Sequence, residues 1–379
     1  MAIKNSTDDV AIFIGIFFPF SCVAIIGNLF ILITIRTTKT LHKPTYYLIA
    51  NMTLADAICA ASILIYTIAL GVFESIDWPI SSLRIVCKFF GPCQLITYIT
   101  ATQTLTAMSI ERYNAVIHPH RKVTKKKNIH LIIIITWIIG IIMSIPFIQI
   151  ITAVPQMHLP CEVIQYKNST YNQVYAGIII TTQYIVPLII MFYTYGYLIT
   201  RLRYRRRHSQ IFRSKKIMPN NQNELKRTIA YALPYITIPT HLQQIRRARH
   251  PGKYISDVIK MAVLVTIAFM ILALPWTIVL AWMTIQRQNL SKIYKHSKGV
   301  LIYLVHLSQT SFLLTSLYNP ILFCVFNQYF RQRLQQIFYL LFRRVTDHFR
   351  NLFHRFQEHT LLKDDDESSS ISSRCTSNC

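Results

Sequence analysis

Acidic residues are scarce in this chain of 379 residues: 15 Asp and Glu stand against 40 Lys and Arg, which gives a formal net charge of +25. Charged residues make up only 15% of the chain, whereas 52% of it is apolar. A soluble domain needs a more heavily charged surface, and nucleic-acid-binding proteins are not normally so apolar. The apolar content also excludes a disordered chain. The combination indicates segments held in a bilayer with cationic loops between them.

The chain also lacks the polar groups that membrane enzymes and pumps place in the bilayer. Asp56 is the only carboxylate well inside an apolar run, so a two-aspartate protease or a carboxylate proton relay has no support. No HExxH motif, Gly-rich phosphate loop or His/Cys metal spacing is present, and we therefore expect no enzyme activity and no cofactor. A transporter remains an alternative, but a protein that carries a signal is favoured.

Seven apolar runs are long enough to cross the hydrocarbon core of a bilayer, which takes about 20 helical residues. The runs are continuous rather than alternating, so helices are predicted instead of barrel strands. The predicted fold class is an all-α membrane protein, a seven-transmembrane helix bundle over residues 10–326. The runs lie at 10–35, 46–73, 86–117, 129–151, 174–200, 257–285 and 299–326.

Basic residues decide the predicted orientation, because loops on the cytosolic side carry an excess of Lys and Arg. With the amino-terminal segment 1–9 outside, the outer segments hold eight of the 40 basic residues and the inner segments hold the other 32. We therefore expect an extracellular amino terminus and a cytoplasmic carboxyl terminus. The basic residues of the inner segments account for most of the net charge, so no nucleic-acid partner is needed to explain it.

Three inner segments differ in character. The long basic stretch 201–256 is either a solvated loop beside anionic lipid or a pair of helix extensions that contact a cytosolic partner. Segment 327–356 has apolar residues at three- and four-residue spacing with Arg between them, which predicts an amphipathic helix on the membrane surface. Segment 357–379 is rich in acids and Ser, and we expect a disordered tail whose hydroxyls could accept phosphate.

The predicted helices carry a scattered set of polar and proline residues. In chain order these are Gly27-Asn28, Asn51, Leu54-Ala55-Asp56, Cys87, Glu111-Arg112-Tyr113, Pro119, Trp137, Pro187, Tyr195, Phe269, Pro275 and Asn319-Pro320-Ile321-Leu322-Phe323. Each is weak alone, but together and in this order they resemble the rhodopsin-like (class A) G-protein-coupled receptors over all seven helices. The resemblance implies a plasma-membrane receptor that binds an extracellular ligand and activates a heterotrimeric G protein.

The resemblance implies an activation switch at the inner end of the third helix. There Glu111 would hold the guanidinium of Arg112, and movement of Arg112 would create contacts for the G protein. The alternative is an ordinary boundary Arg that reaches the lipid headgroups. Phe323 stands where relatives have a Tyr, so a water-bridged pair with Tyr195 is not expected. The implied switch residues are Glu111, Arg112, Tyr113, Tyr195, Asn319, Pro320 and Phe323.

A polar hub around Asp56 is the second implied site, with Asn28, Ser316 and Asn319 as its other members. A carboxyl in hydrocarbon is costly unless it is neutral or paired. It is either a structural group bonded to Asn28 and Asn319 or a sodium- or proton-sensitive centre that couples helix movements. Relatives often complete such a centre with a small polar residue on the third helix. Because Ala101 occupies that position here, no bound metal is predicted.

The sixth helix departs most from the family pattern. Ala273 stands two residues before the proline, where relatives usually have Trp, and Trp276 follows the proline directly. Phe269 is retained, and we expect it to pack beside Pro187 with Thr102 as the third-helix member.

The ligand pocket is predicted to be polar but nearly uncharged. Gln94 stands where amine receptors carry Asp, so a salt bridge to an ammonium group is not possible. This favours the neuropeptide-receptor branch, with an orphan receptor for a lipid or small neutral molecule, or a seven-helix transporter or scaffold without G-protein coupling, as alternatives. Any one of these side chains could instead face lipid or another helix. The candidate residues are Gln94, Thr97, Tyr98, Gln183, Trp276, Trp282, His306 and Gln309.

Cysteines and glycosylation sequons agree with this topology. Four Cys fall in predicted helices (Cys22, Cys59, Cys93 and Cys324), and Cys375 and Cys379 lie on the reducing side, which leaves Cys87 and Cys161 as the expected disulfide. Sequons at Asn5, Asn168 and Asn289 all fall outside, whereas the sequon at Asn51 lies in the bilayer and should stay unused. Expected partners are an extracellular peptide, a G protein, membrane lipids and, at the Ser-rich tail, a receptor kinase and arrestin.

Overall fold

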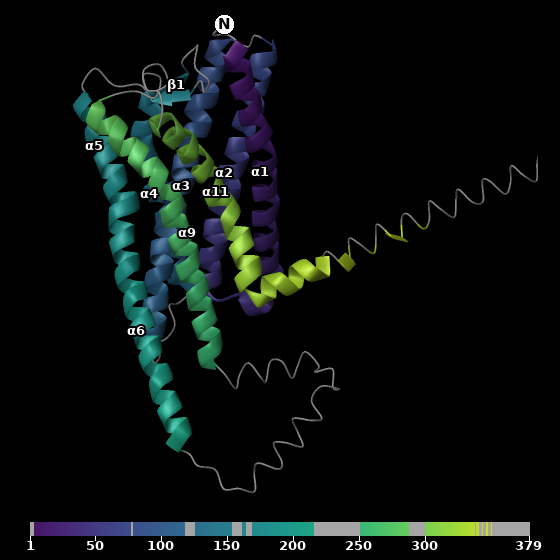
Figure 1. The fold of residues 1–379 in the computed structure, drawn as a ribbon, viewed down its shortest axis with the longest axis vertical. Helices are drawn as coiled ribbons and strands as arrows, with labels where there is room; N and C mark the ends of the chain where they lie inside the picture. Colours follow the sequence, from purple (N-terminus) through teal and green to yellow (C-terminus); the bar gives the residue numbers. More distant parts are fainter. Residues whose placement is uncertain are drawn as a thin grey trace, which may run out of the picture. The chain divides into compact units, whose positions relative to one another are not determined.

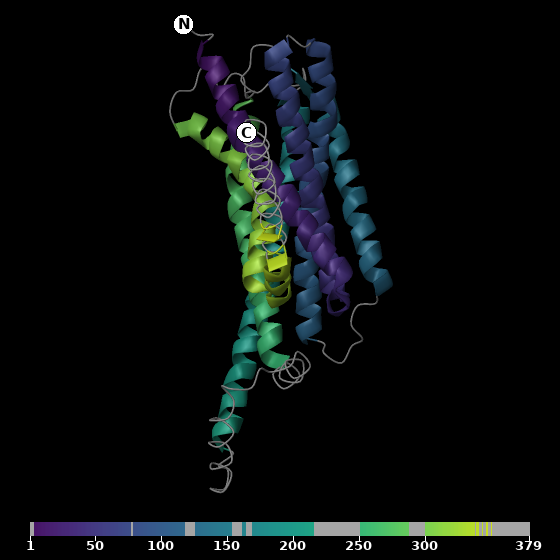
Figure 2. The same cartoon turned by 90° about the vertical axis from the view of Figure 1, so that its right-hand side faces the viewer.

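The computed structural model describes residues 4–76, 79–117, 126–153, 161–163, 169–215, 251–287 and 300–337, together with single positions between 339 and 350. The chain forms two compact units, Met1–Asn327 and Gln328–Cys379. Within the described part of the first unit, helices run side by side as a bundle (Figures 1 and 2).

Seven helical segments cross this bundle in the described residues, and they confirm the predicted fold class. They follow the seven apolar runs, because a chain in lipid must satisfy its backbone N–H and C=O groups within each segment. The segments are α1 (Lys4–Thr37), α2 (Pro44–Ile76), α3 (Ile80–Ile117), α4 (Lys126–Ile150), the fifth segment, composed of α5 (Ser169–Ile180), the π-helical turn η2 (Thr181–Ile185) and α6 (Val186–Lys215), then α9 (Pro251–Gln286) and α11 (Val300–Phe326).

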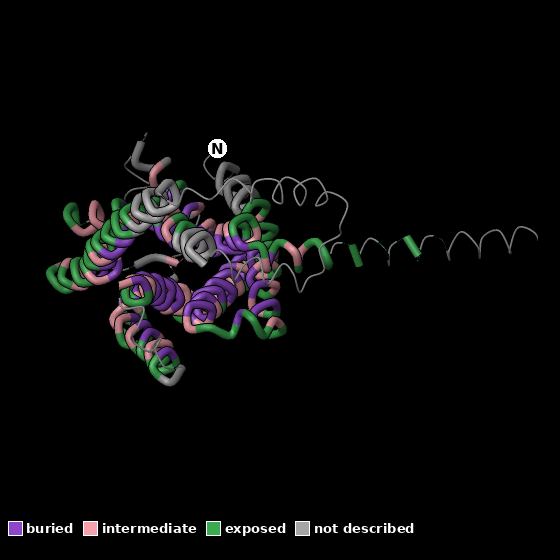
Figure 3. Tube along the Cα trace, turned by 90° about the horizontal axis from the view of Figure 1, so that it is seen from below, coloured by how far each residue is buried: buried purple, intermediate pink, exposed green. Residues whose placement is uncertain are grey.

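Helices adjacent in sequence are also neighbours in space, and the ring is closed by the first and last. Helix α1 packs on α2 and α11, α2 packs on α3, α3 packs on α4 and α6, and α9 packs on α11. Buried positions gather where the helices meet, and exposed ones face outward (Figure 3). The outward faces carry large apolar side chains, such as Ile134, Ile138 and Ile145 of α4, as expected of a surface that contacts lipid.

Helix α3 is polar for a membrane segment. By length and hydropathy alone, five helices of the described residues qualify as membrane spans, or six if α11 is joined to the residues after it, and α3 is not among them. Five threonines lower the hydropathy of α3. All five are buried within the bundle: Thr97, Thr100, Thr102, Thr104 and Thr106. A central helix can therefore be polar, since its neighbours and its own carbonyls supply hydrogen-bond partners.

Both ends of the predicted loop 201–256 are helical, because α6 ends at Lys215 and α9 begins at Pro251. Helix α1 similarly begins at Lys4, inside the segment 1–9 that the sequence assigns to the outside. In the second unit residues 328–337 are helical, within the predicted amphipathic segment 327–356. The predicted tail 357–379 lies outside the described residues.

Candidate functional site

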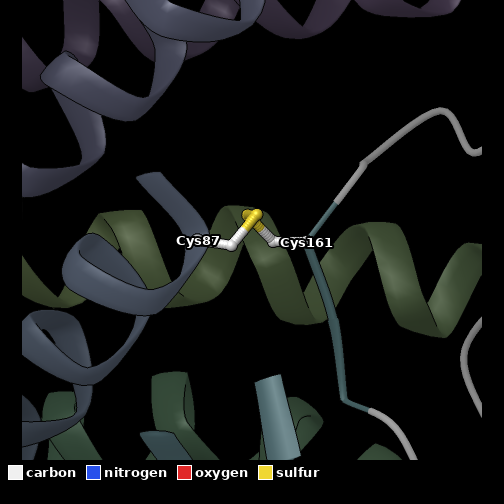
Figure 4. The surroundings of a disulfide bond; sticks show 2 residues. All are labelled: Cys87 and Cys161. Carbon is white, nitrogen blue, oxygen red and sulfur yellow. A yellow bond between two sulfur atoms is a disulfide. The ribbon is translucent and has the colours of Figure 1, made fainter. Parts of the chain in front are cut away.

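A disulfide joins the start of α3 to the connection between α4 and α5. Cys87 of α3 is bonded to Cys161 of strand β2 (Cys161–Val163), as the sequence predicts (Figure 4). Strand β2 pairs antiparallel with β1 (Ile151–Ala153), which follows α4 directly. Ile151 packs with Leu83 and Cys87 in one apolar cluster. The hairpin is thus fixed against the first turns of α3, at the end of the bundle that the sequence places outside.

The candidate ligand residues differ in how accessible their side chains are. Gln94 and Trp276 are half-buried, whereas Tyr98 and Gln183 are buried. The hydroxyl of Thr97 donates to carbonyls of its own helix, 3.0 Å to Cys93 O and 2.9 Å to Gln94 O. Trp282 packs on the cluster formed by Val279 and Val305, and the side chains of His306 and Gln309 lie outside the described residues. The ligand assignment of all these residues remains a prediction.

Gln183 is bound by a residue that the sequence analysis did not single out. Its side chain is 2% exposed and accepts a hydrogen bond at Oε1 from Nε2 of Gln103, at 3.2 Å. The same Gln103 amide group also lies 3.3 Å from the carbonyl of Thr182. These bonds tie α3 to the π-helical turn η2. Only the tertiary packing reveals the pair, because nothing in the local sequence around Gln103 indicates a partner 80 residues away.

Aromatic rings of α3 and α11 contact Phe269 and Trp276 of α9. Tyr98 of α3 stacks on Phe269 with ring centroids 5.6 Å apart, and it also contacts Phe312 of α11 at 5.7 Å. Phe312 in turn lies 6.5 Å from Trp276. The expected packing of Phe269 beside Pro187 stays a prediction. The ring of Phe269 stacks on Tyr98, and the hydroxyl of Thr102 bonds within α3 to the Tyr98 carbonyl at 2.9 Å.

The predicted polar hub is present, with a different bonding pattern. Nδ2 of Asn319 lies 2.5 Å from Oδ2 of Asp56, which is 4% exposed. Asn28 does not bond to Asp56 among the interactions of the described residues; its amide donates instead to the carbonyls of Ala24 and Ser316, each at 2.8 Å. The hub therefore joins α1, α2 and α11, and Asn28 is linked to it through the backbone of α11.

Asn51 joins three helices at one point. Its Nδ2 donates to the hydroxyl of Thr104 on α3 at 2.8 Å and to that of Thr136 on α4 at 3.3 Å. Its Oδ1 accepts a bond from the indole N–H of Trp137 at 2.9 Å. Asn51 and Trp137 both appear in the family pattern. The structure gives the reason: the side-chain amide of Asn51 has donors and an acceptor, so it can bond to neighbouring helices at once.

At the end of α3 that the sequence places inside, Glu111 and Arg112 form an ion pair with 3.0 Å between Oε2 and Nε, and they are 8% and 18% exposed. The same carboxylate oxygen accepts a bond from the hydroxyl of Thr45, at the start of α2, at 3.0 Å. The pair is therefore held from a second helix, which an Arg that only reaches toward headgroups would not require.

The remaining switch residues lie on α3, α6 and α11. The ring of Tyr113 contacts Tyr193 and Tyr197 of α6, with centroids 6.1 and 5.4 Å apart. The hydroxyl of Tyr195 accepts a long bond of 3.4 Å from Thr266 of α9. Phe323 is buried, and Pro320 lies against Gly27 of α1.

A bundle of seven helices, with a disulfide-anchored hairpin at one end and the Glu111–Arg112 ion pair at the other, defines a multi-pass membrane protein of the receptor type. The family model described as "7 transmembrane receptor (rhodopsin family)" matches residues 27–323. The chain therefore belongs to the rhodopsin family of seven-transmembrane receptors.

Individual relatives agree with this family. The Tachykinin-like peptides receptor 99D of Drosophila melanogaster is 26% identical over 366 residues, which cover 91% of this chain and 62% of the relative. The Substance-P receptor of Aquarana catesbeiana is 21% identical over 320 residues, covering 83% and 67%. The chain thus spans less than two thirds of the length of the Drosophila relative. The crystal structure of squid rhodopsin has the same fold, with a TM-score of 0.62, 16% identity and coverage of 89% and 87%.

Proposed function

We propose that this chain is a plasma-membrane receptor that binds an extracellular neuropeptide and activates a heterotrimeric G protein at its cytosolic face. The observation that carries the proposal is the Glu111–Arg112 ion pair, which α2 braces through Thr45. A half-buried guanidinium held by one carboxylate of its own helix can be released by a small movement of the side chain. Release would present a cation with five N–H donors to acceptors of a partner protein.

Three observations support a peptide as the ligand. The uncharged Gln94 stands where an amine ligand would need a carboxylate, and no Lys lies in α11 to form a retinal Schiff base. Two relatives are named as receptors for tachykinin-like peptides and for substance P. The hairpin bonded to α3 through Cys161 gives an extended ligand a fixed rim to contact. A lipid or small neutral ligand is the competing class, and a ligand screen separates the two.

The proposed orientation has the amino terminus outside, the basic inner ends of α6 and α9 toward the G protein, and the positive inner face beside anionic lipid. Ser residues of the tail 357–379 are the proposed sites for a receptor kinase and arrestin. The switch is proposed to comprise Tyr113, Tyr195, Asn319, Pro320 and Phe323 in addition to the ion pair, with the Asp56 hub linking them to the ligand side.

Nucleotide exchange on membranes that contain the receptor and purified G proteins tests the coupling. Ligands come from a peptide library and a lipid library. We expect peptide-stimulated exchange that falls at least about tenfold in Arg112→Ala, because hydrogen bonds to charged groups contribute roughly 1.5–3 kcal/mol. Arg36→Ala, which removes an exposed Arg at the inner end of α1, is the matched control and should retain exchange. Equal exchange in Arg112→Ala and parent would contradict the coupling, and stimulation by lipids alone would contradict the peptide ligand.

A further inference from the structure

Helix α9 lacks one backbone hydrogen bond at Pro275, which divides the helix into an inner and an outer part. Proline has no N–H, so the carbonyl of Ile271, four residues earlier, loses its helical partner. Two residues later the hydroxyl of Thr277 bonds to the carbonyl of Ala273 at 2.8 Å, a side-chain bond of the kind that often accompanies a bend. The backbone of α9 alone therefore does little to fix the angle between the two parts.

Two aromatic residues of α9, Phe269 and Trp276, lie on opposite sides of Pro275 along the chain. They are seven residues apart, which is about two turns, so both project from nearly the same face of the helix. Between them on that face lies Ala273, which is 3% exposed and has only a methyl group.

Tyr98 of α3 and Phe312 of α11 connect the rings of Phe269 and Trp276. The ring centroids of Phe269 and Tyr98 lie 5.6 Å apart with the rings 20° from parallel, and those of Tyr98 and Phe312 lie 5.7 Å apart. The centroids of Phe312 and Trp276 lie 6.5 Å apart. All three separations fall in the range in which aromatic pairs attract beyond the burial of their surface. We name these four residues the aromatic bridge.

We propose that Phe312 is a positioning residue that sets the arrangement of the two parts of α9 through the aromatic bridge. The bridge connects the inner part to the outer part by a route outside the helix, and Phe312 alone contacts both Trp276 and Tyr98 in it. A movement of the inner part away from α3 must separate Phe269 from Tyr98. A ligand that displaces Trp276, a candidate ligand residue, weakens the same sequence of contacts from the outer side.

The inference deepens the proposed function and rests on it for the meaning of the movement, so its test includes a readout that needs no G protein. A fluorine-19 label is placed at Lys260→Cys, an exposed position near the inner end of α9, in detergent-solubilised full-length receptor. The same receptor without Lys260→Cys gives the signal from label on native cysteines. The spectrum reports the populations of the arrangements of the inner part of α9, and nucleotide exchange without ligand is measured in parallel.

We expect Phe312→Ala to raise the minor, displaced population of the label roughly 3- to 10-fold, because two aromatic contacts are lost. Phe312→Tyr keeps the ring and should restore the parent spectrum. The control is Phe147→Ala, which removes another partly buried ring, in the cluster beside the disulfide, and should lower thermal stability without changing the spectrum. If Phe312→Ala is not obtained folded, Tyr98→Leu breaks the bridge from α3 and carries the same expectation.

An unchanged spectrum in Phe312→Ala or Tyr98→Leu, or an equal change in Phe147→Ala, overturns the inference. A changed spectrum without a change in nucleotide exchange supports the bridge and counts against the proposed coupling instead. Exchange that depends on Arg112 together with a spectrum insensitive to Phe312 leaves the function standing and removes the bridge.

Discussion

Gly27 and Pro320 meet where α1 crosses α11, and the space between them admits no side chain. A Cβ at position 27 would lie 2.9 Å from the Cβ of Pro320 and 3.0 Å from its Cγ. The proline ring is rigid and cannot rotate away. Gly140 of α4 makes a second such approach, because a Cβ there would lie 2.9 Å from the carbonyl oxygen of Ile96. These two contacts decide how closely the helix pairs pack.

Gly27→Ala is therefore expected to lower the free energy of unfolding by about 1–3 kcal/mol, the typical cost of overpacking a well-packed contact. Gly15→Ala is the matched control in the same helix, because a Cβ there meets nothing within 4 Å. Ala is the better helix former, so the control should be unchanged or slightly more stable. Thermal unfolding in detergent measures both, and an equal loss in the two variants would show that the contact with Pro320 is not responsible.

At the scale of single residues, the sequence predicted which residues belong to a site better than it predicted which groups they bond to. The disulfide partners of Cys87 and Cys161 followed from which cysteines remained once helices and the reducing side were assigned. The bond from Asn28 to the carbonyl of Ser316 did not follow, because it depends on how α1 and α11 are rotated and shifted along their axes. The Gln103–Gln183 pair was missed for the same reason: the sequence marks polar residues in helices without saying which way they face.

At the scale of elements, the hairpin of β1 and β2 depends on its covalent bond to α3. Two strands of three residues each, paired at Ile151–Val163, Thr152–Glu162 and Ala153–Cys161, are too short to be stable alone. The disulfide closes a sequence separation of 74 residues and adds the constraint that the short ladder lacks.

The double variant Cys87→Ser and Cys161→Ser should therefore release the hairpin and leave the bundle folded. Hydrogen exchange with mass spectrometry should show faster exchange over 151–163 and unchanged protection in the middle of α3. Overall stability should fall by about 2–4 kcal/mol, the usual range for a lost disulfide. Cys22→Ser, which replaces a free cysteine of α1, controls for the loss of thiols. Unchanged exchange over 151–163 would mean that strand pairing alone holds the hairpin.

In the fifth segment the sequence predicted a helix but not the π-helical turn within it. The apolar run 174–200 indicated one helix, and the structure has α5, the π-helical turn η2 and α6. The extra residue of a π-helical turn leaves no signature in hydropathy, since it is stabilised by tertiary bonds such as those of Gln183. The helix extensions to Lys215 and from Pro251 were one of two possibilities for a basic segment, and composition alone could not choose between them.

At the scale of the whole molecule, the uneven distribution of 40 basic residues predicts one orientation in the membrane. In that orientation the sequons at Asn5, Asn168 and Asn289 face the glycosylating compartment. The sequon at Asn51 does not, because Asn51 is buried in α2 and bonded to Trp137. Glycosylation is thus a test of topology that needs neither ligand nor G protein.

We expect enzymatic removal of N-linked glycans to increase the electrophoretic mobility of the receptor expressed in animal cells. The triple variant Asn5→Gln, Asn168→Gln and Asn289→Gln should migrate like the deglycosylated parent and show no further change after treatment. A remaining shift in the triple variant would mean that the Asn51 sequon is used, which is incompatible with its place in α2.

Asn51 also has a consequence for the cooperativity of the molecule. Its three hydrogen bonds, of 2.8, 3.3 and 2.9 Å, make α2, α3 and α4 open together or not at all, because separating any pair of these helices breaks bonds that share one amide. The hydrogen bonds of α9 use a different side chain each: Gln173 and Tyr184 of the fifth segment donate to carbonyls of α9 at 3.1 and 3.5 Å, Thr266 bonds to Tyr195 at 3.4 Å, and Tyr318 of α11 donates to the carbonyl of Val265 at 3.2 Å. Because none of these bonds shares a group with Asn51, α9 can move by breaking them one at a time while α2, α3 and α4 stay joined.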